Sequence, residues 1–153
     1  MRKIILSVLL ITVLVLTLFS NYFLIDSPTP TEAVKFDTGD TAWMIVATAL
    51  VLIMTPGLGF FYGGMVGKKN VISTMLQSFM AMVVVTILWV VIGFGLCFGP
   101  TIGGVIGNPI PNLFFQGVGT NTAWSLAPTI PFMLFALFQA KFAIITPALI
   151  TGA

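Results

Sequence analysis

Residues 71–98 read VISTMLQSFMAMVVVTILWVVIGFGLCF, an apolar run without one charged side chain. About 20 residues of helix cross the hydrocarbon core of a bilayer, so this run is long enough for one tilted transmembrane helix. The uncharged sequence extends further, because no charged side chain occurs between Asn70 and Ala140. A soluble domain of 153 residues cannot enclose so long an uncharged stretch in its core. The sequence therefore predicts membrane spans joined by a neutral loop.

Apolar stretches on either side of this run predict two more spans. We expect the three spans at about 41–62, 71–98 and 128–153, so that residues 34–153 form an all-α, polytopic membrane helix bundle. Asp40 precedes the first span and can serve as its N-cap or as an acidic residue of its first turn. Residues 99–127 carry no charge and are rich in Gly, Asn and Pro, which is typical of an exposed connection.

The composition of the whole chain agrees with a membrane protein and excludes several other classes. It is 58% hydrophobic and 7% charged, with a mean hydropathy of +1.14, whereas about 25% of residues are charged in soluble domains. The net charge of +2 is too small to indicate nucleic-acid binding. With no histidine and one cysteine, no metal site is predicted, and no other cofactor is indicated. The spans offer no acid or base other than a lysine, so no enzyme is predicted.

The first 33 residues resemble a secretory signal peptide. Arg2 and Lys3 precede the uncharged residues 4–19, and small residues make cleavage after Ala33 possible. The alternative is an uncleaved first span that ends near Ile25. We favour a signal peptide because residues 26–31, DSPTPT, are typical of a linker.

Positive charge predicts the orientation of the chain in the cell membrane. Lys68 and Lys69 form the only basic pair between the predicted spans, so their short loop is expected in the cytoplasm. The mature N-terminus, with Asp37 and Asp40, and the loop at 99–127 are then outside.

Small residues in the first span indicate a close helix contact. Gly59 and Gly63 form one small-xxx-small pair, and Gly63 and Gly67 form another, so the backbone of a neighbouring helix can approach there. Pro56 removes a backbone donor within the same span. The pattern fits close packing in a bundle, or an interrupted helix that lines a transport path.

Two phenylalanines in the third span are candidate substrate-binding residues. Phe138 and Phe142 are four residues apart and share one helix face, which Phe135 extends. Two stacked rings could bind a small cation through their faces, at about 0.5–2 kcal/mol for each contact. The alternative is ordinary aromatic packing, or contact with membrane lipid.

Lys141 is a charged residue inside the same span, and no predicted span contains a carboxylate. It could line a hydrated pathway, pair with a carboxylate from a further helix, or snorkel. We therefore expect more helices around this chain, either because it is a fragment or because it is one subunit of an assembly.

Several motifs together resemble the ammonium transporter family. Residues 37–43 (DTGDTAW), 56–57 (PG), 61–64 (FYGG) and 69–71 (KNV) are similar to its opening helix. Residues 138–146, FQAKFAIIT, are similar to its third helix. The resemblance covers residues 37–153, and it implies an inverted-repeat fold of eleven helices that assembles as a homotrimer with one pore in each subunit. This chain would supply the first three helices.

The resemblance also implies roles for single residues. Phe138 would be an aromatic residue of the vestibule that captures ammonium, and Phe142 one of two phenylalanines that gate the path of ammonium or ammonia. The pore histidines of the family belong to later helices, so this chain alone is not expected to conduct. Two rival interpretations are a small three-span structural subunit of a larger membrane complex and a holin-like pore protein, which the long neutral loop and the family motifs make less favoured.

Overall fold

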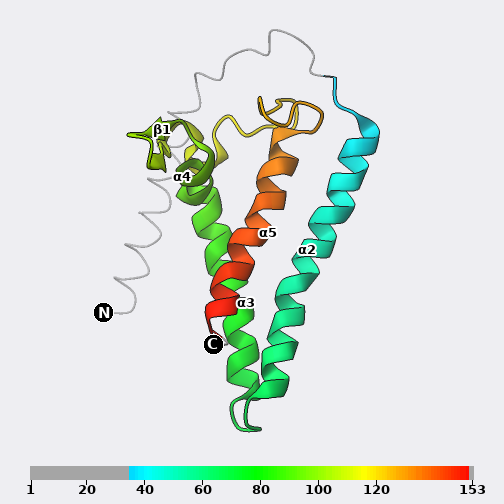
Figure 1. The fold of residues 1–153 in the computed structure, drawn as a ribbon, viewed down its shortest axis with the longest axis vertical. Helices are drawn as coiled ribbons and strands as arrows, with labels where there is room; N and C mark the ends of the chain where they lie inside the picture. Colours follow the sequence, from blue (N-terminus) through cyan, green and yellow to red (C-terminus); the bar gives the residue numbers. More distant parts are fainter. Residues whose placement is uncertain (1–34, 152–153) are drawn as a thin grey trace, which may run out of the picture. The chain divides into compact units, whose positions relative to one another are not determined.

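The computed structural model describes residues 35–151, and in this part of the chain three long apolar helices form the fold (Figure 1). Helix α2 runs from Thr38 to Met65. Helix α3 (Val71–Leu88) continues through a π-helical turn, η1 (Trp89–Gly93), into the short helix α4 (Phe94–Phe98). Helix α5 spans Phe132–Thr151. The predicted signal peptide at residues 1–33 lies outside the described residues.

All three helices are long and apolar enough to cross a membrane: Thr38–Met65, Val71–Phe98 and Phe132–Ile150. The all-α helix bundle is thus confirmed, and the helices fall on the three stretches expected from the sequence. The third begins four residues later than expected. Pro131 restrains Ile130 from helical geometry, and the first free N–H groups of α5 bond to the loop instead. Phe132 donates to the Thr122 carbonyl at 2.8 Å, and Met133 to the Gly119 carbonyl at 3.0 Å.

The N-terminus of α2 is fixed by an acidic cap. The carboxylate of Asp37 accepts from the backbone N–H of Asp40 at 2.8 Å, which satisfies one of the free donors of the first turn. The N–H of Asp37 donates to the Thr129 carbonyl at 2.9 Å. This bond joins the start of α2 to the loop that precedes α5.

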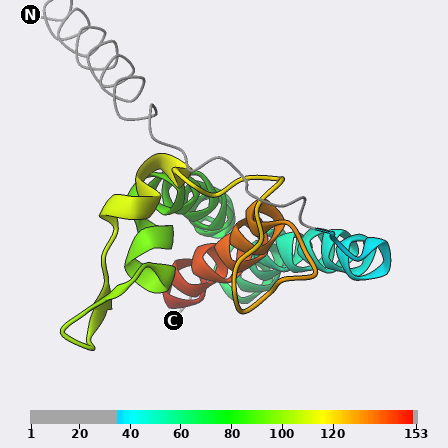
Figure 2. The same ribbon diagram turned by 90° about the horizontal axis from the view of Figure 1, so that it is seen from above.

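Helices α2 and α5 run in the same direction, and α3 runs opposite to both (Figure 1). Each helix contacts the other two, and α5 lies between α2 and α3 when the molecule is seen from above (Figure 2). The turn with Lys68 and Lys69 closes one end of the bundle. Residues 99–131 cover the other end, where Asp37 also lies.

The connection at 99–127 is more ordered than the predicted exposed loop. Strand β1 (Thr101–Ile102) pairs antiparallel with β2 (Ile106–Gly107), and a short, irregular 3₁₀ segment, η2 (Ile110–Phe115), follows. The connection packs on the end of α4 so closely that a Cβ on Gly95 would lie 2.6 Å from the Cα of Pro109.

Two aromatic residues of this connection adopt a left-handed backbone. Phe114 and Phe115 have φ of 53° and 61°, a region that costs an L-residue roughly 1–2 kcal/mol. The ring of Phe115 lies 5.6 Å from that of Phe94. This tertiary contact helps to offset the local strain, which sequence patterning cannot reveal.

Candidate functional site

Phe138 and Phe142 contact each other on α5, as their spacing predicts. Their ring centroids are 5.1 Å apart, and the ring planes meet at 74°. The rings therefore pack edge to face, and the expectation of two stacked faces is wrong. This geometry is favoured because the positive edge of one ring meets the negative face of the other. The two rings together form an angled aromatic surface that a cation can contact.

The aromatic pair lies opposite the packed face of α5. That packed face consists of buried residues that recur every four positions: Ala136, Ala140, Ile144 and Ala148. Phe138 follows Ala136 by two residues, which places it about 200° around the helix axis. Phe138 is half-buried and Phe142 is 42% exposed. The pair therefore faces away from α2 and α3. We call this side of α5, with Phe138 and Phe142, its unpacked face.

Phe135 does not extend the aromatic pair. Its ring lies 4.5 Å from Trp124 of the long connection and 5.2 Å from Phe98 of α4. The expected stripe of three phenylalanines is thus divided between two environments. Phe135 belongs to a set that we call the aromatic cluster: Trp89, Phe94, Phe98, Phe115, Trp124, Phe132 and Phe135.

The aromatic cluster joins η1 and α4, the long connection and the start of α5. Its ring centroids lie 4.5–6.4 Å apart, mostly edge to face. Such pairs contribute about 0.5–1.5 kcal/mol each beyond the burial of their area. Trp124 and Phe115 were not predicted as part of the core, because residues 99–127 have the composition of an exposed connection. Three large aromatics, Phe114, Phe115 and Trp124, in a Gly- and Pro-rich connection were the available signal.

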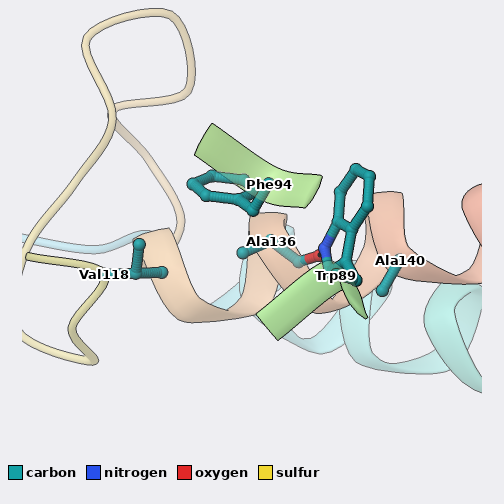
Figure 3. Packing of buried hydrophobic residues seen from close by; sticks show 5 residues of the cluster. All are labelled: Trp89, Phe94, Val118, Ala136 and Ala140. Atoms are coloured by element: carbon teal, nitrogen blue, oxygen red, sulfur yellow. Dashed lines mark hydrogen bonds between the residues drawn. The ribbon is translucent and has the colours of Figure 1, made fainter. Parts of the chain in front are cut away.

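A buried hydrogen bond links the π-helical turn η1 to α5, two residues before the aromatic pair. The indole N–H of Trp89 donates to the backbone carbonyl of Ala136 at 3.1 Å (Figure 3). Trp89 begins the π-helical turn, which brings Trp89 and Phe94, five residues apart, into contact at 5.9 Å. The two rings pack with Val118, Ala136 and Ala140 in one core. A π turn in a helix often occurs near a functional position.

The glycines of α2 meet α3 at two of the three predicted positions. Gly59 and Gly63 are buried, and a Cβ on Gly59 would lie 3.3 Å from the Cβ of Ser78. Gly67 does not join this contact, because α2 ends at Met65 and nothing lies within 4 Å of a Cβ at Gly67.

The remainder of α2 decides between the two interpretations of its small residues. The helix is continuous through Pro56, so the interrupted-helix interpretation is wrong and the contact is one of close packing. Ser78 carries a buried hydroxyl without a hydrogen-bond partner in the described part of the chain.

Lys141 is half-buried at the middle of α5. It follows Ala140 of the packed face and precedes Phe142 of the aromatic pair, so it lies between these two faces. In residues 35–151 the only carboxylates are Asp37 and Asp40, both at the N-terminus of α2.

These residues can contact a small cation, and they can remove water from it. Among the described residues no group of three or more His, Cys, Asp or Glu could hold a metal ion. The side of α5 with Phe138 and Phe142, bordered by Lys141, offers ring surfaces and one cation in an apolar setting. Such a face can bind a small cation by its rings or form an apolar constriction.

Comparisons with known proteins agree on one family. The family model described as Ammonium Transporter Family matches residues 42–153. The chain is 47% identical over 130 residues to an ammonium transporter of Mycobacterium tuberculosis, and the match covers 76% of this chain and 27% of that protein. It is 45% identical over 118 residues to a putative ammonium transporter of Methanothermobacter thermautotrophicus, covering 76% of this chain and 28% of that protein.

Solved structures are similar as well. A mutant form of Mep2 from Candida albicans matches with a TM-score of 0.68 and 35% identity, covering 77% of this chain and 26% of that one. Mep2 from Saccharomyces cerevisiae matches with a TM-score of 0.65 and 32% identity, covering 82% and 30%. The chain thus spans about a quarter to a third of the length of these relatives. With three membrane-length helices, it is a multi-pass membrane protein.

Proposed function

This chain belongs to the ammonium transporter family, and we propose that it forms part of a path for ammonium or ammonia across the cell membrane. The observation that carries the proposal is the aromatic pair of Phe138 and Phe142 on the unpacked face of α5. The pair lies within the segment that the family model matches. Its relatives are transporters, which favours transport over an enzymatic reaction.

In this proposal Phe138 contributes to an aromatic vestibule and Phe142 to a phenylalanine gate. Ammonium is a small cation with four N–H donors, and the negative face of a phenyl ring attracts it at about 0.5–2 kcal/mol. An apolar constriction then opposes the charged form, because an ion is far costlier to desolvate than neutral ammonia. The half-exposed edge-to-face pair offers both surfaces in one turn of helix.

The distribution of charge supports the proposed orientation. Lys68 and Lys69 lie in the turn at one end of the bundle, and Asp37 and Asp40 lie at the other. Basic loops stay on the cytoplasmic side, so we propose that residues 99–131 are outside. The exposed apolar faces of α2 and α3 would contact lipid or the neighbouring subunits of a homotrimer.

The substitution Phe142→Ala in the full gene product tests this function. We expect methylammonium uptake to change by roughly 2- to 30-fold, the equivalent of one cation–π contact. The matched control is Phe79→Ala on α3, since Phe79 is 40% exposed and Phe142 is 42% exposed. Uptake should be measured in cells without another ammonium uptake system, at equal protein abundance. Equal uptake by the two variants would reject the gate, and no uptake by the wild type would reject transport.

A further inference from the structure

Lys141 lies too deep in α5 for its ammonium group to reach water along the helix. Helix α5 has 20 residues, and with a rise of 1.5 Å each Lys141 is about 14 Å from either end. An extended lysine side chain spans roughly 6 Å, so snorkelling covers less than half of that distance. The cation therefore requires a partner or water at its own depth.

The described helices do not supply a carboxylate at that depth. Asp37 and Asp40 lie at the capped end of α2, where Asp37 bonds to Thr129 ahead of α5. The other ionisable groups of α2 and its turn are Tyr62 and the cations Lys68 and Lys69. Tyr62 already donates its hydroxyl to the Leu149 carbonyl at 3.3 Å, near the far end of α5.

The position of Lys141 around the helix indicates where a partner would come from. It is about 100° from Ala140, which is buried against the bundle, and about 100° from Phe142, which is exposed. A helix that covers the aromatic pair would therefore pass beside the lysine. Charge complementarity then indicates one property of that helix, since a cation with an anion and hydrogen bonds close to it costs far less inside a membrane than an unpaired one.

We propose that the unpacked face of α5 docks a membrane helix that carries an aspartate or glutamate at the level of Lys141, and that this helix comes from the remainder of the transporter fold. The inference rests on the proposed function only where it assigns the docked helix to the transporter fold. The ion pair would also neutralise a positive charge beside the proposed gate. An unpaired lysine there would repel ammonium at short range, where screening is weak.

The experiment is zero-length cross-linking of the full gene product in native membranes with dicyclohexylcarbodiimide. This reagent takes up the water that is lost when a carboxylate and an amine in contact form an amide. We expect mass spectrometry to find Lys141 joined to an Asp or Glu in an apolar peptide from outside residues 1–153. Lys141→Arg keeps the charge but should lose the cross-link, since a guanidinium is a poor nucleophile.

A second measurement follows assembly by native electrophoresis. Lys141→Met leaves the partner carboxylate unpaired, so the assembled species should fall on the order of tenfold, while Lys141→Arg retains it. The matched control is Lys69→Met, because Lys69 is exposed in the turn. Wild-type abundance of the Lys141→Met variant would overturn the proposal, and so would a cross-link to Asp26, Glu32, Asp37 or Asp40.

These readouts are independent of transport. A protein that does not carry ammonium but forms the expected cross-link would disprove the proposed function and support the ion pair. A protein that transports normally without the cross-link, in membranes where other amides form, would disprove the ion pair alone.

Discussion

Gly59 and Gly57 differ in what a side chain would meet, although both lie in the same turn of α2. A Cβ on Gly59 would lie 3.3 Å from the Cβ and 3.4 Å from the Oγ of Ser78, whereas nothing lies within 4 Å of one on Gly57. Leucine at position 59 must therefore push α3 away, and leucine at position 57 extends into open space. Both variants gain the same helix propensity, about 0.8 kcal/mol relative to glycine.

The expected difference in unfolding free energy is then the overpacking cost alone. We expect Gly59→Leu to be about 1–3 kcal/mol less stable than Gly57→Leu. Gly59→Ala should be close to neutral, because its gain in propensity, about 1 kcal/mol, offsets a contact that is a few tenths of an ångström too short. Unfolding of the gene product by sodium dodecyl sulfate in mixed micelles measures these values. Equal stabilities for the two leucine variants would refute the close contact of α2 with α3.

Three smaller changes test other contacts, each by the same unfolding titration unless another method is named. Trp89→Phe keeps an aromatic ring but loses the 3.1 Å bond to α5, so it should cost about 0.5–1.5 kcal/mol; an equal loss for Trp43→Phe, at a residue 71% exposed, would contradict this. Ser78→Ala removes a buried hydroxyl without a partner in the described residues, so stability should stay level or rise by up to about 1 kcal/mol; a clear loss would reveal a partner. Asp37→Ala removes the cap of α2 and should cost about 0.5–2 kcal/mol, seen as faster hydrogen exchange in the first turn; unchanged exchange would argue against the cap.

The helices could be predicted from the sequence because their signal is local. A charge-free run such as residues 71–98 has no soluble alternative, and the structure has a membrane-length helix there. The spacing of Phe138 and Phe142 fixed their contact, since residues four apart on a helix meet whatever surrounds them. Their edge-to-face angle was not predictable, because it depends on side-chain torsions and not on spacing.

The contacts between distant segments could not be predicted in the same way. Phe135 has the spacing of the aromatic pair, but Trp124 and Phe98 draw it into the aromatic cluster. Gly67 has the spacing of the glycine contact, but α2 ends before it. In both cases the regular spacing continues in the sequence, but the tertiary structure places one residue of the pattern in a different environment from the others. The sequence shows small or apolar residues at every fourth position: Ala136, Ala140, Ile144 and Ala148. Only the structure shows that this face of α5 packs in the bundle.

Two faces of helix α5 thus have different roles. One face positions the site, and the other carries the residues that we expect to contact substrate or a further helix. One face, with Ala136, Ala140 and the bond from Trp89, is fixed by residues of this segment. The opposite face, with Phe138 and Phe142 and with Lys141 at its border, has no opposing helix among residues 35–151. Substitutions on the fixed face should therefore alter stability wherever the segment folds. Substitutions on the open face should alter flux or assembly only in the presence of the helices that cover it, so the two faces can be tested independently.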